Sequence, residues 1–183
     1  MKVTSKFPKL LLCLVVAGCV ARAQGAALGS APPKLHGQTL NGKDIVLPDA
    51  VMGKVALIIV GASKKGGERT GPWKDHFVAD FGSNGETTYF VAAMLQMVPS
   101  LFRAVIRSGI RGGTPDAERS HVLTSATDED AWKQYLEMKD DSIPSVLLLD
   151  ESGHLRWSYS GIFDSDHYQA LKAAAATLLD RRK

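Results

Sequence analysis

The feature that most constrains the fold is an unbroken apolar run at residues 55–60, Val-Ala-Leu-Ile-Ile-Val. A strand that lacks polar alternation and is rich in β-branched residues is typical of a sheet covered on both faces. Residues 87–95 have the same character and predict a second buried strand. Between the two runs, aromatic residues recur at helical spacing, namely Trp73, Phe77 and Phe81. Strands that alternate with helices predict an α/β domain.

The neighbouring segments fit the same class. Residues 35–47 predict a hairpin, because Asn41-Gly42 supplies the positive φ angles of a tight turn. Residues 61–71 are rich in Gly and Lys and predict a flexible basic loop, and residues 109–115 predict a mobile one. Residues 100–108 predict a short helix with its apolar residues on one side, Leu101, Phe102, Val105 and Ile106.

The C-terminal part predicts the end of the sheet. A short strand at 121–124 precedes a helix capped by Thr127 or Asp128. Residues 145–149 and 154–159 predict a closing hairpin, which a last helix follows. We therefore expect a central mixed sheet with helices on both faces and a C-terminal β-hairpin plus helix.

The N-terminus has the three-part layout of a secretory signal. A basic start precedes an apolar run at 10–20 and the small-residue site Ala21-Arg22-Ala23, which would allow cleavage before Gln24. The run is shorter than the roughly 20 apolar residues that span a bilayer. Residues 16–19 (Val-Ala-Gly-Cys) resemble a bacterial lipobox and offer the alternative of lipidation at Cys19.

Both alternatives predict an exported protein, in a periplasm or outside the cell, whose membrane contact would be a lipid anchor in the second case. The expected divisions are a signal peptide at 1–23 (or 1–18 with lipidation), a flexible tether at 24–34 and a domain at 35–180.

Charge and cysteine content exclude several functions. The 183 residues hold 22 Lys and Arg against 19 Asp and Glu, and removing residues 1–23 leaves 18 against 19. A basic footprint for nucleic acid is therefore lost with the leader. The cysteines, Cys13 and Cys19, also lie in the leader, so the domain holds no disulfide, thiolate nucleophile or cysteine metal site.

The stretch from Ile143 to Trp157 (IPSVLLLDESGHLRW) and the order of elements resemble the thioredoxin-like superfamily, in particular its extracytoplasmic redoxin and peroxiredoxin-type branch. The resemblance spans roughly residues 35–179. It implies that Pro144 forms a cis peptide bond and faces the active site. Where that family has Cys-x-x-Cys or a single peroxidatic Cys, residues 62–67 read Ala-Ser-Lys-Lys-Gly-Gly. The family's redox chemistry is therefore expected to be absent, because residues 62–67 contain no thiol. Ser63 is no substitute, because its neighbours supply no identifiable base to activate its hydroxyl.

A weaker similarity is to the mitochondrial ATP-synthase assembly factor family. It is carried by short pieces, which are residues 100–103 (Ser-Leu-Phe-Arg), the polar loop around Arg111, residues 155–157 (Leu-Arg-Trp) and Ser160-Gly161. This similarity suggests an assembly or chaperone-like role.

Other candidate sites have simpler interpretations. Gly61 and Gly66 have the spacing of a phosphate-binding loop, but Gly67 stands where its Lys is needed, which leaves weak anion binding as the alternative to a plain loop. The five histidines are scattered and predict no metal site. The acids at 128–130 and 140–141 predict solvated charge.

We expect a redox-inactive protein with no catalytic residue, metal or cofactor, which binds an unidentified and acidic polypeptide. The expected contact residues are Ser63, Lys64, Lys65, Arg69, Pro144 and Trp157. Relatives grip extended peptides at this place, and an adjacent strand edge can add a peptide strand. Trp73 and Trp132 are expected in the core and Trp157 half-exposed. The alternatives are a thiol-disulfide oxidoreductase or peroxidase, and a small-ligand carrier with an apolar pocket near Pro144.

Overall fold

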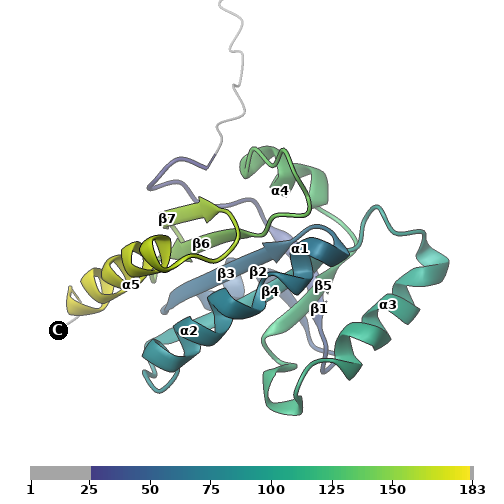
Figure 1. Cartoon of the computed structure of the whole chain (residues 1–183), viewed down its shortest axis with the longest axis horizontal. Coiled ribbons are helices and arrows are strands. Elements are labelled where there is room, and N and C mark those ends of the chain that lie inside the picture. The colour runs from purple at the N-terminus through teal and green to yellow at the C-terminus, as the bar shows by residue number, and fades with distance from the viewer. Residues whose placement is uncertain (1–25, 182–183) are drawn as a thin grey trace, which may run out of the picture.

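An interior strand of the sheet, β3 (Val55–Gly61), is buried at every residue. The computed structural model describes residues 26–181, in which seven strands form one sheet (Figure 1). The strand order is β2-β1-β5-β4-β3-β6-β7. The other strands are β1 (Leu35–Thr39), β2 (Asp44–Leu47), β4 (Thr87–Met94), β5 (Val122–Ser125), β6 (Ser145–Leu149) and β7 (Leu155–Ser160). The pairs β3–β4 and β4–β5 are parallel and the others antiparallel, so the predicted mixed sheet is confirmed.

The helices lie on both faces of this sheet. They are α1 (Lys64–Glu68), α2 (Gly71–Phe81), α3 (Ser100–Gly112), α4 (Glu129–Tyr135) and α5 (Ser165–Asp180), with 3-10 turns at Asp49–Val51 and Asp116–Glu118. Side chains of α2 and α5 pack in one core and those of α4 in the other. In Figure 1, α3 and α5 lie at opposite sides of the molecule.

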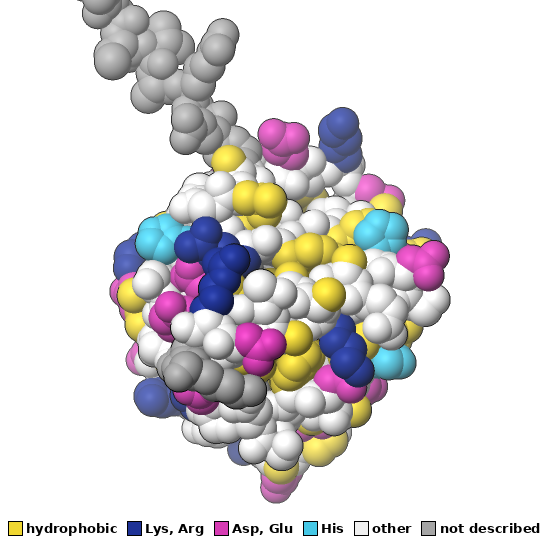
Figure 2. All heavy atoms as spheres, turned by 90° about the vertical axis from the view of Figure 1, so that its left-hand side faces the viewer, with side chains coloured by type: hydrophobic (Ala, Val, Ile, Leu, Met, Phe, Trp, Pro, Cys, Tyr) yellow, Lys and Arg dark blue, Asp and Glu magenta, His cyan; other side chains and the backbone are white. Residues whose placement is uncertain are grey.

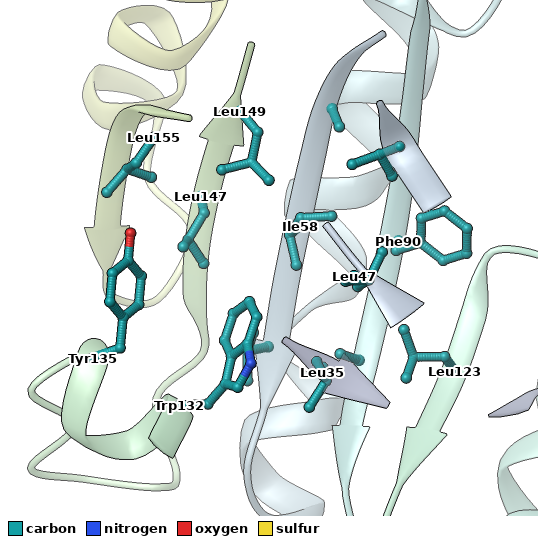
Figure 3. Packing of buried hydrophobic residues seen from close by; sticks show 14 of the residues in the cluster. Leu35, Leu47, Ile58, Phe90, Leu123, Trp132, Tyr135, Leu147, Leu149 and Leu155 are labelled. Carbon is teal, nitrogen blue, oxygen red and sulfur yellow. The ribbon is translucent and has the colours of Figure 1, made fainter. Parts of the chain in front are cut away.

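Alternation along β3 divides its side chains between the two cores. Ile58 is fully buried in the core under α4, where Figure 3 shows Trp132 and Tyr135 pointing toward the sheet. Its neighbour Ile59 is fully buried in the core under α2 and α5. The unbroken apolar run follows from this, because both faces of β3 are covered.

The predicted elements are largely confirmed. The hairpin at 35–47, the buried strands, the helix with Trp73 and the closing hairpin with its helix all form. The Asp164 carboxylate caps α5 by accepting the backbone N–H of His167 at 2.9 Å. Trp73 and Trp132 are buried and Trp157 is partly exposed, as expected.

Two loop predictions are wrong. Residues 64–68 form α1 instead of part of a flexible loop, because the Ser63 hydroxyl caps the helix by accepting the N–H of Gly66 at 3.1 Å. The helix expected at 100–108 continues to Gly112, through most of the predicted mobile loop at 109–115. A glycine costs a helix about 1 kcal/mol and does not forbid it.

The acids at 128–130 also depart from prediction. Glu129 is buried, not solvated, with its carboxylate accepting the Gln96 N–H at 3.0 Å and lying 2.8 Å from Lys133 Nζ. These partners compensate the burial of its charge, and the hydrogen bond that Lys133 donates to Glu129 raises the pKa of Lys133. Asp128 occupies the N-cap position of α4 without a capping hydrogen bond, because its carboxylate accepts the N–H of His36 at 3.0 Å.

The start of the described chain is attached to the sheet. Within the predicted tether at 24–34, the Gly29 N–H donates to the Leu155 carbonyl at 2.7 Å, and the Leu155 N–H donates to the Ser30 carbonyl at 2.8 Å. The predicted signal peptide at 1–23, the alternative at 1–18 and Cys19 lie outside the described residues.

Candidate functional site

The loop after β3 and the loop before β6 form one structure at one end of the sheet. The Ser63 hydroxyl, besides capping α1, donates to the Asp141 carbonyl at 2.9 Å. The Arg69 guanidinium donates to the Ser142 carbonyl at 2.8 Å. A Cβ at Gly66 would lie 2.5 Å from the Asp141 carbonyl oxygen, so only glycine allows this close approach. We call this surface, residues 63–69 with 140–144, the α1 platform.

The hydroxyl of Ser63 is occupied by structural hydrogen bonds. Both hydrogen bonds of its hydroxyl join it to backbone groups, one as acceptor and one as donor. A serine nucleophile needs a base that takes its proton, and here the proton is directed at a carbonyl oxygen. The arrangement accounts for Ser63 as a helix cap.

The cations of the α1 platform are partly compensated. Lys64 and Lys65 are exposed, and Lys64 lies 3.8 Å from the Glu68 carboxylate. Asp140 lies on the same surface with its pKa lowered, chiefly by the backbone N–H of Ser142. The platform is therefore mixed in charge, and its basic character is weaker than the lysines alone suggest.

The cis peptide bond that the family resemblance implies at Pro144 is not present. The Ile143–Pro144 bond is trans, and the cis peptide bond of the described residues is Leu47–Pro48. The trans form of X-Pro is lower in energy by about 0.5–1 kcal/mol unless the surroundings select cis. Pro144 is also buried, whereas Ser142 and Ile143 beside it are half-buried.

Trp157 lies apart from the α1 platform, in an aromatic cluster on the face covered by α2 and α5. Its ring centroid is 6.2 Å from those of Trp73 and Tyr159. It pairs with Leu148, three residues along β6 from the Ser145–Ser160 pair, which corresponds to about 10 Å. The structure thus brings together Ser63, Lys64, Lys65, Arg69 and the Pro144 loop, and places Trp157 further along the edge.

The strand β7 is the last of the sheet and continues from this platform. The Gly161 N–H donates to the Pro144 carbonyl at 3.2 Å, and the buried Trp73 donates its indole N–H to the Gly161 carbonyl at 3.3 Å. Ile162, which follows, is 54% exposed. Figure 2 shows the side of the molecule where α5 and β7 lie, with apolar side chains gathered near its middle. Sequence reasoning missed Ile162, because a lone apolar residue in a loop has no pattern.

A second surface was also not predicted. A groove of about 890 Å³ lies between α3 and the hairpin β1–β2, far from Pro144. Its lining includes Lys43, Asp44, Asp49, Arg103 and Arg107. A carrier with an apolar pocket near Pro144 is not supported by this groove, because Pro144 is not among its lining residues.

Residues 26–181 hold no group of three His, Cys, Asp or Glu side chains that could bind a metal ion. Within the same residues, no helix combines the length and the apolar character needed to cross a bilayer.

Comparison with known proteins shows the fold and no more. No family model matches the sequence, and no curated protein matches it. A protein from Chlorobium tepidum described as a DsbE-type thiol:disulfide interchange protein superposes with a TM-score of 0.63 and 16% identity, over 85% of this chain and 99% of that one. BsSco, of the Sco family of cytochrome c oxidase assembly proteins, superposes with a TM-score of 0.56 and 13% identity, over 83% of this chain and 97% of that one. The exposed lipoprotein thioredoxin Etrx1 of Streptococcus pneumoniae superposes with a TM-score of 0.54 and 18% identity, over 77% of this chain and 99% of that one. The chain therefore has a thioredoxin-like fold.

Proposed function

We propose that this protein binds an extended segment of another polypeptide, without oxidising or reducing it, in an assembly or chaperone-like role. The observation that carries the proposal is the outer edge of β7, the last strand of the sheet, at Ser158–Ser160. Residues 29–30 hydrogen-bond only to Leu155 at the start of this strand, and no strand of residues 26–181 lies beside the rest of it. The backbone groups of such an edge can pair with one further strand. Residues 62–67, where the thioredoxin-like family that this chain resembles has its redox cysteines, contain none, which supports binding without electron exchange.

The register of β6 and β7 indicates which backbone groups face outward. Gly161 and Pro144 form a hydrogen-bonded pair, and such pairs alternate with non-bonded ones along an antiparallel ladder. Trp157 and Tyr159 therefore direct their backbone groups at β6, whereas Ser158 and Ser160 direct theirs outward. The side chains of both serines are exposed and small, so they leave room for a further strand.

The end of β7 would add side-chain contacts. The exposed Ile162 offers an apolar contact, and Lys64 and Lys65 on the α1 platform favour an acidic segment. Asp140 and Asp141 on the same platform oppose that preference. We therefore assign most of the affinity to backbone pairing and apolar contact.

The alternative is a thiol-disulfide oxidoreductase or a peroxidase. It would require sulfur from outside the domain, because the last cysteine of the chain is Cys19. Purified protein is expected to turn over neither insulin disulfides nor peroxide above a blank without protein. Activity above that blank would overturn the proposal.

The binding test uses a matched pair of variants at Ser158. Ser158→Pro removes the outward N–H and leaves the bonds to β6, as proline does on edge strands, whereas Ser158→Ala keeps that N–H. With the photo-cross-linking residue p-benzoyl-phenylalanine in place of Ile162, we expect polypeptide capture in cells. Ser158→Pro is expected to reduce capture between about twofold and tenfold, and Ser158→Ala to preserve it.

The same cross-linker at the exposed Ala176 of α5 serves as the control position. Equal capture at Ala176 and Ile162, or equal capture by the two Ser158 variants, would contradict binding at the β7 edge.

A further inference from the structure

The apolar side of helix α3, which a helix ordinarily buries, is exposed to solvent. None of its side chains is buried, although an amphipathic helix of a globular protein normally packs its apolar stripe on the core. Leu101 is 79% exposed, Val105 69% and Phe102 55%. Met97, just before the helix, is exposed as well. Within the described residues, nothing covers this apolar stripe.

The opposite side of α3 carries Arg103, Arg107 and Arg111 at intervals of four residues. Arg107 and Arg111 donate hydrogen bonds to backbone carbonyls of residues 38–40, and Arg107 also donates to Thr124 Oγ1 at 2.6 Å. The helix is thus attached to the domain by its basic side. Its apolar side is directed outward as a consequence.

The charge of α3 contrasts with that of the domain. Residues 26–181 hold 16 Lys and Arg against 19 Asp and Glu, whereas the helix has three arginines and no acid. The hydrogen-bond acceptors of these arginines are carbonyl and hydroxyl oxygens, which do not cancel the charge. A net-acidic domain therefore carries one concentrated positive element.

The apolar and basic sides of α3 form two layers. A helix is about 10–12 Å across, so the guanidinium groups lie about that far behind the apolar stripe. A bilayer has the same succession, with hydrocarbon inside and charged head groups outside. An amphipathic helix that lies in the interface inserts its apolar side about 5–10 Å, which leaves its basic side at the level of the head groups.

We infer that α3 docks the domain on a membrane surface that contains anionic lipid, with Leu101, Phe102 and Val105 inserted. At 13 residues the helix is about 20 Å long, so it lies along the surface and does not span the bilayer. This surface is separate from the β7 edge and independent of the proposed function.

Two other occupants fit α3 less well. A second copy packed on the same stripe would cover the apolar side chains, but it would leave the arginines on the far side of each helix and offer them no acid, because neither helix has one. An acidic helix of another protein would cover the apolar stripe, but its carboxylates would have to reach around α3 to the arginines behind it. A layered medium satisfies both sides at once.

The test measures hydrogen exchange of residues 100–112 in the full exported chain, with vesicles of phosphatidylcholine alone or mixed with phosphatidylglycerol. We expect protection of α3 with the mixed vesicles only, weakening as salt is raised. The double variant Leu101→Gln, Phe102→Gln removes exposed apolar contacts, and we expect it to need about tenfold more lipid, or still more, for the same protection.

The control is Met52→Gln, because Met52 has an exposure of 53%, close to that of Phe102, and lies outside α3. It should bind lipid as the unaltered chain does. Equal protection by the double variant and the control, or protection by neutral vesicles alone, would overturn the inference. Protection of α3 without vesicles that rises with protein concentration would indicate that a second copy binds there. Protection by a polyglutamate peptide but not by vesicles would indicate an acidic polypeptide. Either result would also overturn the inference. The Ser158 variants leave α3 unchanged, so failure here is distinguishable from failure of the proposed function.

Discussion

Among single residues, Asp150 shows most clearly how a local motif acquires a structural role. It opens the turn between β6 and β7 and is buried. Its carboxylate accepts the backbone N–H groups of Ser152 and His154, each at 2.9 Å, and Arg156 Nε at 2.6 Å. Burial raises the pKa of Asp150, but the hydrogen bonds from His154, Arg156 and Ser152 outweigh it and hold that pKa below its ordinary value.

This lowered pKa predicts acid sensitivity. A carboxylate with a lower pKa in the folded state stabilises the fold above the unfolded pKa, about 3.9, and loses that contribution as the pH falls through the folded pKa. Asp150→Asn should cost about 1–3 kcal/mol of unfolding free energy at neutral pH. Urea unfolding should show a smaller difference between variant and unaltered protein at pH values below about 3.9. A difference that is the same at both pH values would refute this account.

Among the elements, α3 depends on polar contacts to an unusual degree. The other long helices, α2 and α5, bury aromatic or aliphatic side chains, whereas α3 buries none. The hydrogen bonds of Arg107 to residues 38–39 and to Thr124 join this helix to β1 and β5, and Arg111 adds one to the Leu40 carbonyl. A charged hydrogen bond contributes about 1.5–3 kcal/mol, so their loss is significant for one element.

Arg107→Gln should therefore release α3 locally without unfolding the sheet. We expect hydrogen exchange of residues 100–112 to accelerate about tenfold or more, with the amides of β3 unchanged. Leu101→Gln on the same helix is the control and should leave exchange as it is, because Leu101 is exposed. Equal acceleration in β3 would show that Arg107 supports the whole domain instead.

At the scale of the whole molecule, one sheet joins two cores. Ile58 and Ile59 are adjacent and fully buried, but they belong to different cores because successive side chains point to opposite faces. The sheet between them is continuous, so the two cores should unfold together.

We therefore expect Ile58→Ala and Ile59→Ala each to cost about 2–5 kcal/mol, and each to shift a single unfolding transition. Circular dichroism and tryptophan fluorescence, followed during urea unfolding, check this. Two separated transitions in either variant would show that the cores are independent.

The surface residues of the candidate site could be predicted only in part. Ser63 and Arg69 were expected near Pro144, and their hydrogen bonds to Asp141 and Ser142 place them there. The burial of Pro144 was not predictable, since proline is common both in exposed loops and beneath them. Ile162 and the outward backbone of β7 depend on which strand ends the sheet, which no local pattern indicates.

The sequence by itself determined the elements: the doubly covered β3, the helical spacing of Trp73 and Phe77, and the closing hairpin, because hydrophobic periodicity acts over a few neighbouring residues. It also determined that residue 63 carries a hydroxyl and no thiol. Only the tertiary structure decided which side of each element meets the protein. In α3 the periodicity is identical for a buried and an exposed stripe, and the contacts of Arg107 with a distant strand made the apolar side the outer one.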